Sequence, residues 1–325
     1  MPILGTSASQ NTKSFLFSPT GYLAGGYIDG YVSTIRKLNM DNDTYSTSAT
    51  SMDIQVSDGG GITNSGTAGY MTGGYQPSVS SRLDSIRKIL YASDSLSTLG
   101  ATLQGWTSSG WTGENPFTAG YQNVGFAAGD GYGPKWTNKV TFSTDTRSNL
   151  ANTSSVKRIV VQRGMQNANI AGYLPGGSNF LNSEYNSIEK MSYSSESFST
   201  IGATLTKIAY NIANISNYGV AGYATGGNGN DYNSKFIDKI TFSNDSKSTI
   251  SAQITGGKQA IMGLSNKNTG GYYAGGTNGG AGGGESPGGV ITDKFTFSTE
   301  TISNLGTTFP GQYTGAYYFE NTGAA

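Results

Sequence analysis

Runs rich in aromatic and β-branched residues alternate along this chain with clusters of polar turn formers. In one representative stretch, residues 220–227 end in two glycines, and residues 236–242 are rich in β-branched and aromatic side chains. A polar turn at 244–246 then leads to a Ser- and Thr-rich run at 247–251. Such runs, bounded by turn formers, predict β-strands that are joined by loops and hairpins. The next strand is expected near residues 259–264.

This unit occurs six times. Each copy has a Gly-aromatic pair, a strand that contains Lys, a tight acidic turn and a Ser/Thr-rich strand. The Gly-aromatic pairs are 48, 56, 47, 50 and 49 residues apart. A repeat near this length is typical of a four-stranded blade of a β-propeller. The pairs are Gly21-Tyr22, Gly69-Tyr70, Gly125-Phe126, Gly172-Tyr173, Gly222-Tyr223 and Gly271-Tyr272.

The sequence therefore predicts an all-β chain with one domain over residues 1–325, a six-bladed propeller. Residues 3–6 resemble 304–307, and residues 15–21 resemble 317–323, so the chain carries two copies of a strand pair that one ring needs once. Either copy serves to close the ring. A free copy has unpaired backbone groups that favour association. We expect the surplus copy to be residues 312–325, lying against a neighbouring protein or a blade edge, which makes the chain an oligomer or a bound subunit. A seven-bladed ring is the alternative, although it would lack two strands of its last blade.

Each unit also contains a Lys six residues before an acid. We interpret these pairs as hairpin structure, in which the acid shapes the turn and the Lys stem packs along the strand. The alternative is a ring of charges that binds a ligand. The pairs are Lys37 and Asp43, Lys88 and Asp94, Lys139 and Asp145, Lys190 and Glu196, Lys239 and Asp245, and Lys294 and Glu300.

The amino-acid composition excludes several classes of binding and catalytic site. The chain has 20 Lys and Arg against 20 Asp and Glu, which gives no overall positive field for nucleic acid or anionic membranes. It has no Cys and no His, which excludes disulfides, thiolate or His-based metal sites and His-containing catalytic triads. We expect no cofactor. We also expect no signal peptide and no transmembrane segment, because the start lacks a basic stretch and no long apolar run exists.

The Gly-Tyr-x-x-Gly-Gly strand, the Lys-containing strand and the Ser/Thr strand resemble kelch repeats, with Ser/Thr where kelch units usually carry Trp in the outer strand. The variant at Lys139-Val140-Thr141-Phe142-Ser143-Thr144-Asp145-Thr146 resembles the kelch-type virion proteins of tailed bacteriophages, particularly cyanophages. The resemblance implies a propeller fold and a place on a virus particle. Fold alone does not give function.

Loop content varies between the units, and aromatic residues gather in loops that a propeller places on one face. Exposed aromatic rings beside Asn, Ser and Gly suit sugars or a protein partner. The competing interpretation is that the rings pack against their own loops. Tyr27, Tyr31 and Tyr185 belong to this face, and the residues that we predict to bind are Trp106, Trp111, Trp136, Tyr75, Tyr132 and Tyr232.

From the sequence we expect a non-catalytic virion protein, a structural or attachment protein that presents its loops to a host-surface glycan or to another virion protein. A purely structural virion subunit is one alternative. An enzyme that acts on polysaccharides is the other, although no local pair of carboxylates is visible among Glu114, Asp130, Glu184, Asp231, Glu285 and Asp293. Acid-rich turns such as residues 41–43 do not match the spacing of an EF-hand, so we expect no metal there.

Overall fold

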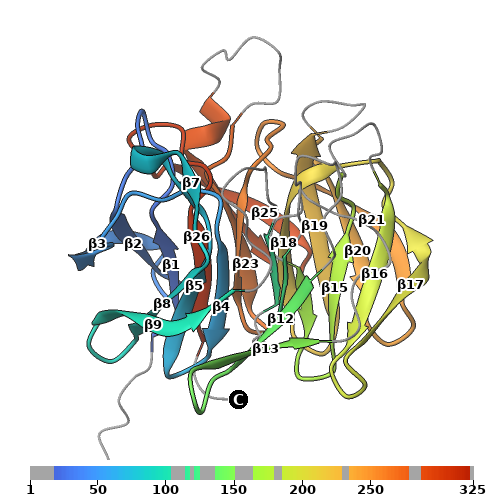
Figure 1. The fold of residues 1–325 in the computed structure, drawn as a ribbon. Helices are drawn as coiled ribbons and strands as arrows, with labels where there is room; N and C mark the ends of the chain where they lie inside the picture. Colours follow the sequence, from blue (N-terminus) through green and yellow to red (C-terminus); the bar gives the residue numbers. More distant parts are fainter. Residues whose placement is uncertain are drawn as a thin grey trace, which may run out of the picture.

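The chain is a β-propeller in the computed structural model (Figure 1). The structure describes residues 18–103, 114–117, 121–124, 136–150, 164–178, 185–228, 234–277 and 287–322. Within these ranges the only helical turns are two short 3-10 segments, η1 (Pro77–Val79) and η2 (Pro287–Val290). The predicted all-β class is therefore confirmed. In the described ranges, no helix is long and apolar enough to cross a membrane.

The described strands pair into six four-stranded antiparallel sheets, with a two-stranded hairpin of β6 (Tyr75–Gln76) and β7 (Ser81–Arg82) beside them. The sheets, in hydrogen-bonded order, are β26 (Tyr317–Asn321), β1 (Thr20–Ala24), β2 (Thr34–Asn39) and β3 (Thr44–Ser51); β4 (Gly60–Asn64), β5 (Ala68–Thr72), β8 (Ser85–Leu90) and β9 (Leu96–Thr102); β10 (Glu114–Phe117), β11 (Tyr121–Val124), β12 (Trp136–Thr141) and β13 (Thr146–Leu150); β14 (Met165–Asn167), β15 (Ala171–Pro175), β16 (Ser187–Ser192) and β17 (Ser197–Thr204); β18 (Tyr210–Asn217), β19 (Ala221–Asn228), β20 (Phe236–Thr241) and β21 (Ser246–Gln253); and β22 (Met262–Asn266), β23 (Gly270–Ala274), β24 (Ile291–Thr296) and β25 (Thr301–Thr307).

The number of recognised blades is five, so the predicted six is not confirmed, and neither is the alternative of seven. The described strands form six hydrogen-bonded four-stranded sheets, whereas five blades are recognised. The sheet β10–β13 is the least completely described, because residues 104–113, 118–120, 125–135 and 151–163 around its strands lie outside the described ranges.

The C-terminal strand closes the propeller. β26 pairs antiparallel with β1, with Tyr22 opposite Phe319, and becomes the inner strand of the first sheet. Figure 1 shows this red strand beside the blue strands of the N-terminal part. The expectation that residues 312–325 are the surplus copy, lying against a neighbouring protein or a blade edge, is therefore wrong for residues 317–321, which are buried as the inner strand of the first sheet. The N-terminal copy, residues 1–17, lies outside the described ranges.

The third unit begins earlier than its Gly-aromatic pair suggested. In five sheets the Tyr of this pair lies opposite the repeated Lys, as Tyr70 does opposite Lys88. In the third sheet the residue opposite Lys139 is Tyr121. The pair in this unit is thus Gly120-Tyr121 and not Gly125-Phe126. The corrected steps from Tyr70 to Tyr121 and on to Tyr173 are 51 and 52 residues, closer to the period of the other units.

The glycines of four of these pairs make room for the neighbouring sheet. A Cβ at Gly69 would lie 2.1 Å from the Phe319 ring, and one at Gly222 would lie 2.1 Å from Sδ of Met165. Gly271 and Gly21 meet Ile215 and Leu264 in the same way, at 2.4 and 2.6 Å, and in each case the partner is a large side chain on the inner strand of the preceding sheet. Only a residue without a side chain allows inner and second strands of adjacent sheets to approach this closely.

The repeated Lys and acid join neighbouring sheets. Each Lys donates to the acid of the following unit, as Lys37 does to Asp94, 57 residues away, and not to the acid six residues on. The tyrosine opposite the Lys adds a second bond in most units; Tyr70 Oη, for example, donates to Asp145 at 2.8 Å. The ion pairs are Lys37–Asp94, Lys88–Asp145 (2.7 Å), Lys139–Glu196 (2.5 Å), Lys190–Asp245 (2.8 Å), Lys239–Glu300 (2.5 Å) and Lys294–Asp43 (2.8 Å).

This arrangement, which we call the clasp, corrects part of the prediction. The acids do shape the hairpin turns, since all six have a φ between 49° and 60°. A left-handed φ is readily adopted by Asp and is unusual for Glu, so the cross-sheet ion pair explains why Glu196 and Glu300 occupy this position. The Lys side chains also lie over the tyrosine rings, with Lys88 Nζ 5.5 Å from the Tyr70 centroid. Each Lys pairs with the acid of the following unit and not with the acid six residues on, so the expected grouping within one hairpin was wrong. The interpretation that these residues have a structural role stands.

Candidate functional site

The loop face, which we define as the connections between second and third strands and between consecutive sheets, carries the candidate site. These connections meet at one end of the propeller: Tyr27 bridges to Thr314, and Ser57 bridges to Tyr75. Of the predicted binding residues, Tyr75 is described there, at the start of β6. Trp136 is the first residue of β12 and not a loop residue as predicted. Trp106, Trp111, Tyr132 and Tyr232 lie outside the described residues.

Three tyrosines from two sheets come together on this face. The rings of Tyr27 and Tyr31, both in the connection between β1 and β2, pack edge to face with centroids 5.3 Å apart. The ring of Tyr31 also contacts Tyr75, which follows β5, at 6.2 Å. Edge-to-face and tilted pairs of this kind are the favoured aromatic geometries. Tyr27 is nevertheless 46% exposed, so its ring faces solvent as well as its neighbour.

Two charged residues complete this group, which we call the tyrosine cluster: Tyr27, Tyr31, Tyr75, Arg82 and Asp58. The guanidinium carbon of Arg82, on β7, lies 5.1 Å from the Tyr75 centroid. Asp58, in the connection from β3 to β4, is exposed to solvent, and yet desolvation raises the pKa of its carboxyl, with Arg82 and the Ser57 hydroxyl opposing that shift. Water therefore reaches part of the carboxyl group, while neighbouring protein atoms surround the rest of it. The sequence interpretation missed Arg82 and Asp58, because neither stands out from its local pattern.

Backbone hydrogen bonds between separate connections hold the cluster in place. Tyr27 N donates to Thr314 O at 2.9 Å, and Tyr75 and Ser57 exchange a pair of bonds of 2.7 and 3.0 Å. Asp58 N donates to Gly315 O at 2.7 Å. Gly315 is required there, because a Cβ would lie 2.8 Å from the Asp58 carboxylate and because its φ is +64°. The side chains therefore project from a fixed backbone and not from independent loops.

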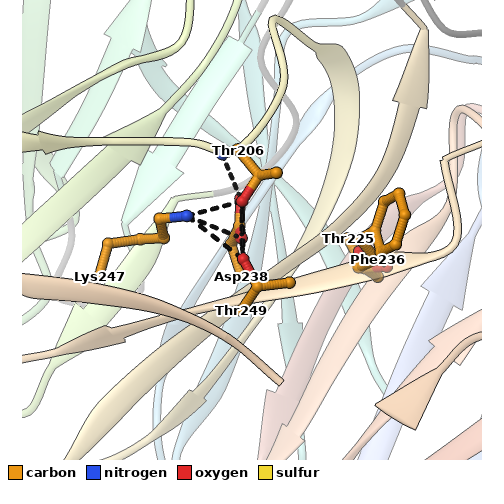
Figure 2. Close-up of polar contacts among 6 residues, drawn as sticks. All are labelled: Thr206, Thr225, Phe236, Asp238, Lys247 and Thr249. Atoms are coloured by element: carbon orange, nitrogen blue, oxygen red, sulfur yellow. Dashed lines mark hydrogen bonds and ion pairs between the residues drawn. The ribbon is translucent and has the colours of Figure 1, made fainter. Parts of the chain in front are cut away.

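A small recess on the loop face lies beside Asp238 of β20. Figure 2 shows the polar contacts of this residue. Asp238 Oδ1 accepts from the hydroxyls of Thr206 (2.6 Å) and Thr249 (2.7 Å), and Oδ2 accepts from Thr206 N (2.7 Å). Lys247 Nζ is 3.5 Å from the same carboxylate. The recess encloses about 20 Å³, room for roughly one water molecule. Figure 2 shows Phe236 to one side of this network; its ring is 40% exposed.

The Asp238 network joins the third strand to the preceding connection. Asp238 directly precedes the repeated Lys, and its counterparts in other sheets bond to the preceding connection in the same way. Arg87 pairs with Asp53 at 2.7 Å, and Asp293 pairs with Lys258 at 3.2 Å. The common element is a polar residue on the third strand that anchors the incoming chain, with the charges reversed in one copy.

The pair of Lys258 and Asp293 is fully buried, with both side chains 0% exposed. Desolvation lowers the pKa of Lys258, and the charge of Asp293 opposes that shift. In the sequence, Asp293 is only one of the acids without a local carboxylate partner, and its pairing with Lys258 was not predicted. Its partner is 35 residues away, so no local spacing reveals it. The pair has no access to solvent and belongs to the interior.

The acidic turn at residues 41–43 is occupied by protein partners. Asp43 accepts from Lys294 and from Tyr272 Oη, at 2.8 and 2.6 Å. Among the residues that the structure describes, no group of three or more acidic or metal-binding side chains gathers. The tyrosine cluster is therefore the best candidate for a functional site in the described part of the chain.

No protein-family model matches the chain. No curated protein matches it at a significant level. The class that the fold defines is the β-propeller, and the function has to be argued from the site.

Proposed function

We propose that this chain is a non-catalytic, six-bladed, kelch-like propeller that binds a partner with its loop face, as a structural or attachment protein of a virus particle. The partner is a host-surface glycan or another virion protein, including a second copy of the chain. The resemblance of residues 139–146 to the repeats of phage virion proteins supports the place on a particle.

The clasps support six blades. They link each unit to the next one, and Lys294–Asp43 links the last unit back to the first. The sheet β10–β13 takes part on both sides, through Lys88–Asp145 and Lys139–Glu196. A closed cycle of six like contacts is expected of six equivalent blades around one axis. A propeller of five blades would leave one of the six sheets outside a cycle of which it forms two links.

The observation that carries the binding role is the tyrosine cluster. Tyrosines and Arg are the residue types enriched at contact hot spots, and here they converge from two sheets on a fixed backbone. The exposed ring of Tyr27 is available to a partner without rearrangement. Preorganised side chains lower the entropic cost of binding.

The carboxylates support a non-catalytic role. Glycoside hydrolysis needs two carboxyl groups that face one substrate. On the described part of the loop face, Asp238 and Asp293 are bound to protein donors. Asp29 and Asp58 are exposed carboxylates on separate connections. An enzyme that acts on polysaccharides therefore stays the third candidate, behind a purely structural virion subunit whose faces are covered in the particle.

Binding of the purified chain to host cells and to isolated virion proteins tests this function. We expect binding that falls when Tyr27, Tyr31 and Tyr75 are replaced together by Ala, while the melting temperature changes little. Matched replacement of exposed residues on the opposite end, Ile170 and Val220 (63% and 52% exposed), should leave binding unchanged. A purely structural subunit would bind only virion proteins, and equal binding by both variants would contradict the role of the loop face.

A further inference from the structure

The tyrosine cluster combines three kinds of group on one part of the loop face. Its aromatic surface is the exposed face of Tyr27. Its acceptor is the Asp58 carboxylate, and its donor is the Arg82 guanidinium. These groups are linked by direct contacts: Tyr31 packs on Tyr27 at 5.3 Å and on Tyr75 at 6.2 Å. Arg82 lies 5.1 Å from the Tyr75 centroid, and Ser57, next to Asp58, bridges to Tyr75. The charge of Asp58 adds to the desolvation that raises the pKa of Tyr31, and Arg82 opposes it. Polar groups of both signs therefore converge beside an exposed ring.

This combination suits a polyhydroxylated ring. A pyranose has an apolar face of C–H groups that packs on an aromatic ring, and its edge carries hydroxyls that donate and accept at once. A carboxylate accepts from such hydroxyls, and a guanidinium donates to them through a fixed fork. Small-molecule sites generally combine aromatic walls with a few convergent polar groups of this kind.

The charges favour a neutral ligand. An anionic sugar or a phosphate would lie against Asp58, and a cationic ligand would lie against Arg82. The rings also exclude an aromatic cage for a quaternary ammonium group, because Tyr27, Tyr31 and Tyr75 pack directly on one another at 5.3 and 6.2 Å and leave no space between them.

We propose that the tyrosine cluster is a binding site for a neutral hexopyranose unit of a glycan, with Tyr27 stacking on the sugar and Asp58 and Arg82 bonding its hydroxyls. This inference rests on the proposed function of the loop face, and it names the ligand class and the residues. The bonds of Thr314, Ser57 and Gly315 to the cluster keep the three parts in register.

The test is an array of immobilised neutral, uronic-acid-containing and amino-sugar glycans, followed by calorimetry with the best-bound neutral oligosaccharide. We expect the wild type to select neutral hexose glycans. Tyr27→Ala should weaken binding at least tenfold, equivalent to about 1.4 kcal/mol, whereas Tyr27→Phe keeps the ring and should lose less than about threefold. Arg82→Met should weaken binding as well. Phe236→Ala, on another part of the same face, is the matched control and should bind as the wild type does.

Asp58→Asn separates ligand recognition from a structural role. Asn also adopts the left-handed φ of 55° that Asp58 has, so the backbone is preserved. Without the carboxylate, Arg82 leaves the site positive, and we expect the array profile to shift toward uronic-acid glycans. Each variant is checked for an unchanged melting temperature.

The outcomes separate the inference from the proposed function. Neutral selectivity that the cluster variants weaken supports the inference. If none of the cluster variants changes glycan binding, the inference is overturned, and the glycan binds at a site other than the tyrosine cluster. A wild type that binds no neutral glycan on the array but binds a virion protein through the loop face also overturns it, while the proposed function stands. If neither glycans, cells nor virion proteins bind, both are wrong.

Discussion

A single methyl group at Gly69 tests how the propeller closes. A Cβ on this residue of β5 would lie 2.1 Å from Cε2 of Phe319 and 2.3 Å from its Cδ2. The ring cannot yield easily, because it is fully buried and stacks on Tyr22 with centroids 5.3 Å apart and an interplanar angle of 7°. Overpacking in a core costs about 1–3 kcal/mol, and the rigid surroundings place Gly69→Ala toward the upper end, about 2–3 kcal/mol.

Two other strand glycines give matched controls. A Cβ at Gly100 of β9 or at Gly202 of β17 would meet nothing within 4 Å. Replacing either by Ala should therefore leave the protein unchanged or stabilise it by about 0.5–1 kcal/mol, the usual penalty of glycine within a strand. Urea denaturation measures all three variants, with the change read from the midpoint at constant slope.

A double-mutant cycle then tests the contact itself. Phe319→Ala should cost about 3–5 kcal/mol. In the double variant the new methyl at Gly69 enters the space that the ring left, so the double variant should be more stable than the sum of the two changes by at least about 1 kcal/mol. Effects that add within about 0.5 kcal/mol, or a Gly69→Ala variant as stable as Gly100→Ala, would show that β26 does not occupy this position.

Three further outcomes follow from the structure. Deleting residues 317–325 should unfold the chain or leave it prone to association, because the first sheet loses its inner strand, whereas deleting residues 1–17 should leave a folded monomer; the reverse result would make the N-terminal copy the closing strand. In a cycle of Lys139→Met and Glu196→Gln, measured by denaturation, the coupling should be positive and no more than about 1 kcal/mol, as for a partly exposed ion pair, and zero coupling would argue against β10–β13 as a blade. The pKa of Asp58 is raised in the folded state, so its ionised form opposes folding at neutral pH, and the protein gains stability as the pH falls through that pKa. Asp58→Asn should therefore be at least as stable as the wild type at pH 7, and the difference in stability between the two should shrink in acid. A variant that is less stable than the wild type at pH 7 would show that the carboxylate makes favourable contacts instead.

Much of the fold could be predicted from the sequence because each unit repeats the same strand composition and turn residues. Strand composition and turn residues located the strands, and β19, β20 and β21 fall within a few residues of the predicted runs. Where two local signals compete, the pattern misleads. The third unit offers both Gly120-Tyr121 and Gly125-Phe126, and only the pairing of Tyr121 with Lys139 decides between them.

The rest depends on contacts between units, which spacing does not encode. Lys37 and Asp43 are six residues apart in the sequence, but the ring geometry brings Asp94 to Lys37 and leaves Asp43 to Lys294. The same limit applies to the site. The loops of Tyr27, Tyr31 and Tyr75 were predicted to share one face, whereas Arg82 and Asp58 join them only through the packing of neighbouring sheets.

The central claim is that this propeller binds through its loop face without chemical conversion, and one measurement tests both parts. The chain is incubated with polysaccharide extracted from the host surface, and bound protein and newly released reducing ends are measured in the same sample. The account predicts retention of the wild type, loss of retention in the Tyr27→Ala variant, and no reducing ends above the level of a protein-free control. Release of reducing ends in proportion to the protein, or equal retention of the Tyr27→Ala variant, would contradict it.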